Sequence, residues 1–275
     1  MSEVLTMGII IAIIVIIAVY LFLIAPRIIN RPDMSKLHGA HYAHRGLHDN
    51  ETDAPENSMK AFKQAVDAGY GIELDVQMTA DGQVVVTHDF NLKRICGVEK
   101  QVNELTYAEL HQYPILKSDE RIPLFTDFLK MVDGKVPLVV ELKCRNGKDP
   151  IAAKADEILR DYKGVYCIES FDPRVLLWYK KNRPEVVRGQ LSGNLNKENK
   201  AKGAMKLVYW ALTHLLLNVA TRPDFIAYDI HYNEPARRLC RLMGAPNVAW
   251  TVRTREEYEK AKKSYDLFIF EKVKL

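Results

Sequence analysis

Cysteine is scarce in this chain of 275 residues, and its distribution suggests no metal-binding motif. The four cysteines are Cys96, Cys144, Cys167 and Cys240. None of them forms a CxxC pair, and no Cys/His spacing is typical of a zinc site. The sequence therefore argues against structural zinc and favours four reduced thiols in a reducing compartment.

A large excess of charge of either sign is also missing. The 39 Lys and Arg residues and the 35 Asp and Glu residues leave a net charge of +4, and no compact basic block is present. We therefore expect no nucleic acid among the partners. The 48% hydrophobic and 27% charged residues, without a low-complexity segment, are typical of a globular protein with a sizeable core.

The N-terminal segment lacks charge altogether. From Gly8 to Ala25 it reads GIIIAIIVIIAVYLFLIA, where the Tyr20 hydroxyl is the only polar side-chain group. At ~1.5 Å per residue this run of 18 residues spans ~27 Å, close to the hydrocarbon thickness of a bilayer. Secretory signals usually have a basic start and a small-x-small cleavage site, whereas this chain has Glu3 and then LIAPRIIN. The pattern predicts a retained transmembrane anchor over residues 1–25.

Cations flank this predicted anchor on its C-terminal side only, at Arg27, Arg31 and Lys36. The positive-inside rule then predicts a single-pass protein of the cell membrane with its main domain in the cytoplasm. Three cations leave the opposite orientation open. Residues 26–39, with Pro26 and Gly39, are predicted to be a linker, and residues 40–275 have the size of one α/β barrel.

Short apolar runs alternate with helical patterns along residues 40–275. The predicted strands are residues 40–43, 72–76, 84–87, 136–142, 165–169, 186–190, 225–228, 248–252 and 267–270. The predicted helices are residues 58–68, 123–132, 150–162, 173–182, 234–243 and 255–264. Asn57 or Ser58 is expected to cap the first helix. Repeated strand–helix units predict the α/β class, and their number suits a (β/α)8 TIM barrel preceded by one transmembrane helix. The strands at 72–76 and 84–87 are predicted to form a hairpin at Asp81-Gly82.

Residues 193–222 depart from the alternation and are predicted to be an insertion in the barrel. Their basic start leads into LVYWALTHLLLNVA, a helical pattern over about residues 206–220 that is apolar on most sides. One interpretation is a helix that covers the barrel. The other is a helix in the membrane interface, where four lysines face lipid phosphates: Lys197, Lys200, Lys202 and Lys206.

Acidic residues lie where the predicted strands end, the edge at which barrel enzymes place their chemistry. Glu73 and Asp75 are two residues apart, so they face the same side of a strand, and Glu141 ends a later strand. Inward carboxylates repel each other unless a cation lies between them. Three carboxylates suit a hard divalent ion such as Mg²⁺ or Ca²⁺.

Basic groups end the same set of strands. His44 and His88 follow different strands, which allows them to flank a reacting centre as base and acid. Arg45 and Lys143 supply positive charge for an anionic group such as a phosphate. Each of these residues taken singly fits a solvated or structural role. Their joint placement favours metal-assisted phosphodiester chemistry.

The ordered motifs AHRG, PENS, IELDVQMTADGQVVVTHD, VELK and AWTV resemble those of the glycerophosphodiester phosphodiesterase family. The resemblance is dense over about residues 40–143 and thins out toward Trp250. It implies a (β/α)8 barrel that uses a divalent metal to hydrolyse glycerophosphodiesters to glycerol 3-phosphate and an alcohol. The implied roles are catalysis for His44 and His88, metal binding for Glu73, Asp75 and Glu141, and substrate binding for Arg45, Lys143, Asn57 and Trp250.

Two features depart from the family pattern. The last strand of the family commonly ends in a Thr-Asp-x-Pro pattern, whereas this chain reads LFIFEKVKL with Glu271, and residues 193–222 exceed what a minimal barrel needs. Both departures bear on the identity of the substrate more than on the type of reaction. Lysophospholipids are therefore included among the expected substrates. The alternatives are a phospholipase D-like or cyclising lipid phosphodiesterase, and a non-catalytic membrane-tethered binding protein.

Overall fold

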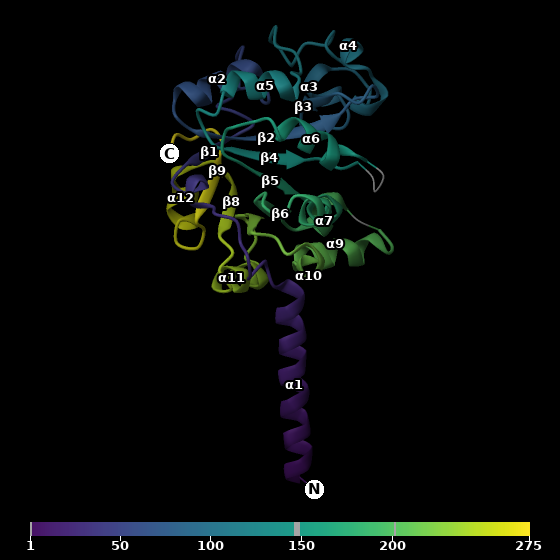
Figure 1. The fold of residues 1–275 in the computed structure, drawn as a ribbon, viewed down its shortest axis with the longest axis vertical. Helices are drawn as coiled ribbons and strands as arrows, with labels where there is room; N and C mark the ends of the chain where they lie inside the picture. The colour runs from purple at the N-terminus through teal and green to yellow at the C-terminus, as the bar shows by residue number, and fades with distance from the viewer. Residues whose placement is uncertain (1, 146–148, 201) are drawn as a thin grey trace.

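The computed structural model describes residues 2–145, 149–200 and 202–275. Residue 1 of the predicted anchor (1–25) and residue 201 of the predicted insertion (193–222) lie outside the described residues. In the described part of the chain, eight parallel strands close into a barrel, because β1 pairs with both β9 and β2 (Figure 1). Its strands are β1 (His41–His44), β2 (Gly71–Met78), β4 (Leu138–Leu142), β5 (Tyr166–Ser170), β6 (Arg188–Ser192), β7 (Phe225–Asp229), β8 (Asn247–Val252) and β9 (Leu267–Phe270). The short β3 (Val84–Val86) pairs antiparallel with β2 and forms the predicted hairpin. The predicted TIM barrel is therefore confirmed.

Helices surround the barrel and connect its strands (Figure 1). The longer ones of the barrel are α2 (Met59–Asp67), α5 (Phe125–Val132), α6 (Ile151–Leu159), α7 (Pro173–Asn182), α11 (Pro235–Leu242) and α12 (Arg255–Ala261). Shorter pieces are η1 (Ser35–Leu37), α3 (Lys93–Cys96), η2 (Val102–Glu104) and α4 (Tyr107–Leu110). Of the two residues expected to cap α2, Ser58 is the cap, because its side chain accepts a hydrogen bond from the backbone N–H of Ala61.

Alternation along the strands separates two layers of side chains. In β4, Val140 and its apolar neighbours pack under the helices, whereas Val139 joins Tyr42 and Phe225 in an apolar cluster inside the barrel. Glu141 follows Val139 on the same side of β4 by the period of two. The interior is thus apolar toward the start of the strands and polar toward their C-terminal ends, which places the charged groups at one end of the barrel.

Helix α1 (Ser2–Ile24) projects from the domain as a long rod (Figure 1). Within its residues Glu3–Ile24, a window of 18 residues has a mean hydropathy of 3.3, and the helix is long and apolar enough to cross a membrane. A signal sequence meets the same criteria of length and composition.

The segment predicted to be a linker, residues 26–39, lies against the barrel. The Arg27 backbone N–H donates to the Pro223 carbonyl at 2.9 Å, and Arg31 donates to the Met243 carbonyl at 2.8 Å. Further along, Leu37 is buried under the barrel, where its carbonyl accepts a hydrogen bond from the Tyr42 hydroxyl at 2.7 Å. These contacts fix the path of the chain from α1 into β1.

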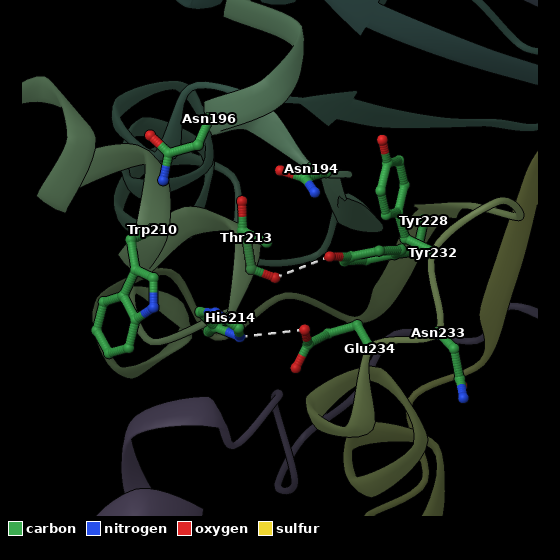
Figure 2. Close-up of a pocket in the computed structure, with 9 residues that line it drawn as sticks. All are labelled: Asn194, Asn196, Trp210, Thr213, His214, Tyr228, Tyr232, Asn233 and Glu234. Carbon is green, nitrogen blue, oxygen red and sulfur yellow. Dashed lines mark hydrogen bonds and ion pairs between the residues drawn. The ribbon is translucent and has the colours of Figure 1, made fainter. Parts of the chain in front are cut away.

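The insertion between β6 and β7 forms α8 (Leu195–Asn199), α9 (Met205–Thr213) and α10 (Asn218–Thr221). The expectation of one helix over residues 206–220 is therefore wrong. The helix breaks because Leu215 has a left-handed φ of 58° and buries its side chain in the main core cluster. Just before the break, His214 Nδ1 lies 3.1 Å from Glu234 Oε2 across a small cavity between α9 and α11 (Figure 2).

Candidate active site

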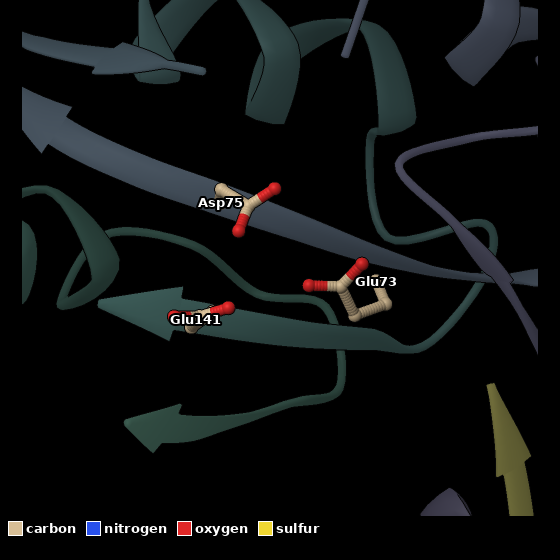
Figure 3. A group of neighbouring side chains, drawn as sticks. All are labelled: Glu73, Asp75 and Glu141. Atoms are coloured by element: carbon tan, nitrogen blue, oxygen red, sulfur yellow. The ribbon is translucent and has the colours of Figure 1, made fainter. Parts of the chain in front are cut away.

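Three buried carboxylates form the centre of the site. Glu73 and Asp75 come from β2 and Glu141 from β4, and their side chains converge on one space inside the barrel (Figure 3). Asp75 pairs in register with Glu141, and one oxygen from each of the three lies within 4.8 Å of the others. The predicted cluster is therefore formed, because parallel register and a period of two bring the three groups together.

The burial of these carboxylates changes their proton affinities. Burial raises the pKa of Glu73 well above its ordinary value, and the nearby charge of Asp75 adds to this. Burial also raises the pKa of Glu141. Burial acts in the same direction on Asp75, but Lys143, His88 and Arg45 hold the pKa of Asp75 well below its usual range. A further cation among the three would favour their charged forms, as metal ligands require.

The donor set fits a hard divalent ion. It consists of carboxylate oxygens, which Mg²⁺ and Ca²⁺ prefer. Asn57 donates from Nδ2 to Asp75 Oδ2 at 3.0 Å, which fixes the carboxylate, while Asn57 Oδ1 is buried without a hydrogen-bond partner among the described residues. This unsatisfied oxygen beside the carboxylates agrees with a cation at this position.

The two predicted phosphate-binding cations lie against the carboxylates. Lys143 Nζ is 2.9 Å from Glu141 Oε1 and 3.3 Å from Asp75 Oδ1. Arg45 Nε is 3.3 Å from Asp75 Oδ2, and Arg45 Nη1 is 2.6 Å from Glu56 Oε1. The guanidinium of Arg45 and the ammonium of Lys143 therefore lie at the rim of the carboxylate cluster. A phosphate bound beside this cluster would contact both groups.

Two residues that support this cluster have left-handed backbones. Arg45 has a φ of 56° and Asn57 a φ of 55°, in a region that costs non-glycine residues about 1 kcal/mol each. The Asn57 N–H donates to the Arg45 carbonyl at 3.0 Å, so the two positions hold each other. Strain at paired residues that touch Asp75 is consistent with a functional constraint.

His44 is held by a residue that the sequence reasoning did not place in the site. Its Nδ1 lies 2.7 Å from Glu271 Oε2, and its Nε2 lies 3.9 Å from Glu73 Oε2. Arg253 Nε donates to the other oxygen of Glu271 at 2.8 Å. Burial lowers the pKa of His44 to about 4, which outweighs the hydrogen bond to Glu271. The imidazole is therefore neutral at pH 7, with Nδ1–H directed to Glu271.

His88 lies in the loop after β3 and is more exposed than His44. Its Nδ1 is 2.6 Å from Asp89 Oδ1, and Arg94 Nε donates to Asp89 Oδ2 at 2.6 Å. Burial would raise the pKa of Asp89, but the hydrogen bonds from His88 and Arg94 bring it to about 2. An ionised carboxylate therefore stands beside His88 and orients its ring through Nδ1.

A cavity of about 1540 Å³ opens over this end of the barrel. His88, Glu141, Lys143 and Trp250 line its polar floor. Another part of its lining is largely apolar and comes from α9, through Met205, Val208, Tyr209 and Leu212. Trp250 packs edge-on against Phe171 at 5.7 Å between ring centroids and forms part of the cavity wall.

Glu169 is a fourth buried acid that the sequence reasoning did not select. It lies one residue before the end of β5, in register with Glu141, and its Oε2 has no hydrogen-bond partner among the described residues. Burial raises the pKa of Glu169 well above its ordinary value, and the charges of Glu141 and Asp75 add to this. Its place at the end of the predicted strand 165–169 was the available signal.

Known proteins resemble this chain in both sequence and fold. The curated relatives include lysophospholipase D GDPD1 of Rattus norvegicus, 32% identical over 52% of this chain and 48% of that protein. A glycerophosphodiester phosphodiesterase of Caldanaerobacter subterraneus subsp. tengcongensis is 28% identical over 81% of this chain and 89% of that protein. The chain thus spans about half the length of the first of these and most of the second.

Solved structures share the barrel. A phosphodiesterase of Oleispira antarctica in complex with the product sn-glycerol-3-phosphate has a TM-score of 0.69 at 20% identity, covering 85% of this chain and 93% of that one. The Thermotoga maritima glycerophosphodiester phosphodiesterase has a TM-score of 0.61 at 26% identity, covering 85% and 95%. The sequence model of the glycerophosphoryl diester phosphodiesterase family matches residues 44–266, a range that contains the three carboxylates and both histidines and ends before Glu271. With more than half of its length matched, the chain belongs to the glycerophosphoryl diester phosphodiesterase family.

Proposed function

We propose that this chain is a membrane-anchored, metal-dependent phosphodiesterase that hydrolyses glycerophosphodiesters to glycerol 3-phosphate and an alcohol. One observation carries the proposal. Three buried carboxylates, the cations of Arg45 and Lys143, and two imidazoles with carboxylate partners meet at one end of the barrel. This combination supplies a grip for a phosphate and a base and an acid beside it.

Glu73, Asp75 and Glu141 would hold the ion, and Asn57 fixes Asp75 by its hydrogen bond. When bound, a divalent ion supplies positive charge that stabilises the developing charge on the phosphoryl oxygens. Arg45 and Lys143 bind the non-bridging oxygens of the diester, and Trp250 packs against the substrate in the cavity.

The histidines divide the proton transfers. His44 is neutral at pH 7 and directs Nδ1–H to Glu271, so Nε2 accepts the proton of the attacking water. As the water oxygen bonds to phosphorus, the bond to the alcohol oxygen breaks. His88, whose ring Asp89 orients through the contact to Nδ1, donates a proton to that leaving oxygen.

The apolar wall of the cavity favours a second class of substrate. Met205, Val208 and Leu212 offer the acyl chain of a lysophospholipid an apolar surface within the same cavity as Lys143. Cleavage on the alcohol side would then release the head-group alcohol, a lysophospholipase D reaction. The name of the Rattus norvegicus relative agrees with this option.

A substrate panel tests the proposal. Purified full-length protein is assayed with glycerophosphocholine, glycerophosphoethanolamine and palmitoyl-lysophosphatidylcholine, each with Mg²⁺, Ca²⁺ or Mn²⁺ and after EDTA. Turnover that depends on the ion and releases glycerol 3-phosphate, or its acyl derivative from the lysophospholipid, supports an enzyme. Binding of these diesters without turnover under every ion would support the alternative of a tethered binding protein. A cyclic phosphodiester as the final product would support the cyclising alternative.

The anchor and its orientation form a separate part of the proposal. Helix α1 has the length and hydropathy of a span, and Arg27 and Arg31 lie on its barrel side. We therefore expect protease added to sealed cells to leave the barrel intact and to digest it after lysis. Digestion in sealed cells would place the barrel outside, and release of a shortened chain from the membrane would identify α1 as a cleaved signal.

A further inference from the structure

Exposed apolar side chains outside α1 gather on one end of the domain. Among the described residues beyond α1, the strongly exposed large ones are Ile28, Ile29, Leu177, Met205, Leu207, Val208, Trp210 and Leu242. They lie on the segment after α1 and on α7, α9 and α11. Helix α1 contacts α10 and α11, and α10 packs on α7, so these three helices lie around the end of α1; α9 lies at the same end of the domain (Figure 1). We call this surface the anchor face.

The direction of α1 relative to the anchor face is fixed by contacts to its last turn. Asn218 Nδ2 donates to the Ile24 carbonyl at 2.9 Å, and Cys240 Sγ lies 3.2 Å from the same oxygen. Arg222 donates to the Ala25 carbonyl at 2.7 Å, and its guanidinium lies 4.8 Å from the centroid of the Phe22 ring. Because α10 and α11 hold the helix from separate positions, a bilayer crossed by α1 lies next to the anchor face.

Helix α9 has one side on the anchor face and the other on the active-site cavity. On the outer side, Leu207 is 68% exposed and Trp210 is 47% exposed. On the inner side, Tyr209 and Leu212 line the cavity that also contains Lys143. One helix of nine residues therefore lies between the anchor face and the active-site cavity, and its exposed Met205 and Val208 belong to both.

The outer side of α9 is connected to the start of α11 by side-chain contacts. The Trp210 ring lies 5.0 Å from the His214 ring, and His214 pairs with Glu234, which caps α11 (Figure 2). Since α11 also holds α1, the exposed indole is tied to the same helix as the anchor. Exposed lysines lie at the N-terminal end of α9, where Lys202 before the helix and Lys206 in its first turn provide charge for anionic lipid head groups.

We infer that α9 lies in the interfacial layer of the bilayer and forms the rim over which membrane-borne monoacyl glycerophosphodiesters enter the cavity. The inference rests on the proposed function and names the surface that supplies its lipid substrate. A Trp ring with a wet N–H and a Leu beside lysines suit the boundary between head groups and acyl chains. The occupant of the anchor face is therefore a lipid surface.

Substrates that differ only in their acyl chain test the inference. The full-length protein, in vesicles of phosphatidylcholine with phosphatidylglycerol, is assayed for choline release. The substrates are glycerophosphocholine, hexanoyl-lysophosphatidylcholine as a dissolved monomer, and palmitoyl-lysophosphatidylcholine within the vesicles. We expect Leu207→Ser with Trp210→Ser to lower the rate on the palmitoyl substrate about tenfold, as loss of two interfacial apolar groups implies. The rates on the two dissolved substrates should stay within about twofold of wild type.

Two further variants serve as controls. Leu207→Met with Trp210→Phe keeps the outer side apolar and should retain the rate on the palmitoyl substrate. Tyr209→Ser changes the inner side and should affect the hexanoyl and palmitoyl substrates alike. Equal losses on all three substrates in the serine double variant, or no loss on any, would overturn the inference. Absence of choline release by the wild type from every substrate would instead refute the proposed function.

A spectroscopic measurement identifies the occupant directly. Lipids brominated near the head groups should quench a component of the tryptophan fluorescence that is missing in Trp210→Phe. If that component resists both brominated lipid and aqueous iodide, and cross-linking gives a dimer, a second copy covers the anchor face and the inference is wrong. Quenching by iodide alone would also overturn it, because the indole would then face water.

Discussion

Replacement of Glu271 by Gln examines how His44 is kept ready to accept a proton. In the wild type the two oxygens of Glu271 serve two donors, His44 Nδ1–H at 2.7 Å and Arg253 Nε at 2.8 Å. Burial opposes ionisation of Glu271, but these two hydrogen bonds hold its pKa well below the usual range. The group is therefore a carboxylate throughout a normal assay, and the lone pair of His44 stays on Nε2.

A glutamine has one oxygen for the two donors. The guanidinium of Arg253 has no alternative to donating, whereas the imidazole can move its proton from one nitrogen to the other. We expect the amide oxygen of Glu271→Gln to face Arg253 and its NH₂ group to face His44. The proton of His44 then moves to Nε2, which can no longer act as a base. Loss of a general base costs about two to four decades in rate, or about 3 to 5 kcal/mol of transition-state stabilisation.

The comparison with Glu271→Ala distinguishes a tautomer effect from a loss of packing. Alanine removes the orienting group but leaves both tautomers accessible, so we expect a smaller loss, about one to two decades. The assay is kcat/KM on glycerophosphocholine at saturating ion, with Glu271→Asp as the conservative variant expected to recover most of the rate. Wild-type activity in Glu271→Gln, or a much larger loss in the alanine variant than in the glutamine variant, would refute this reasoning.

Further predictions concern the ion, the proton transfers and the buried fourth acid. Glu73→Gln and Asp75→Asn should abolish most turnover while the barrel stays folded. Both variants should also lose the stabilisation that Mg²⁺ or Ca²⁺ gives the wild type in thermal unfolding, which is about 2.7 kcal/mol at an ion concentration 100-fold above Kd. A thermal shift equal to that of the wild type would contradict the ligand assignment. His44→Ala and His88→Ala should each cost about two to four decades in rate. A substrate with a very good leaving group should rescue His88→Ala only, and rescue of His44→Ala alone would reverse the two roles. Burial raises the pKa of Glu169, so the folded state binds its proton more tightly than the unfolded chain and wild-type stability falls as pH rises above the unfolded pKa of about 4.3. Glu169→Gln lacks this group, so in EDTA its melting temperature relative to wild type should rise from pH 5 to pH 8; a constant difference would show that the acid is not neutral in the fold.

The barrel and most of the site follow from local sequence patterns. Glu73 and Asp75 share a face because the strand repeats every two residues, and the chain needs only parallel register to bring Glu141 beside Asp75. Pairing of β1 with β2 likewise places His44 opposite Glu73. These relations depend on the period of the strands and on closure of the barrel, both of which the sequence implies.

Apart from Glu169, the features that were not predicted depend on contacts between distant segments. Glu271 reaches His44 only because β9 pairs with β1 across the point where the barrel closes, and no local pattern announces that contact. In the sequence, Glu271 appeared only as a departure from the family ending. The break in the helix at Leu215 has a similar cause, since burial of that side chain in the core outweighs the helical pattern around it.

Turnover that depends on a divalent ion is the measurement that tests the central claim most directly. Purified full-length protein, stripped with EDTA and returned to Mg²⁺, Ca²⁺ or Mn²⁺, is incubated with glycerophosphocholine, and glycerol 3-phosphate is measured. We predict no product after EDTA, product after return of at least one ion, and almost none in Glu73→Gln under the same conditions. Equal product formation with and without EDTA, or by Glu73→Gln at the wild-type rate, would contradict the assignment of these carboxylates to a catalytic ion.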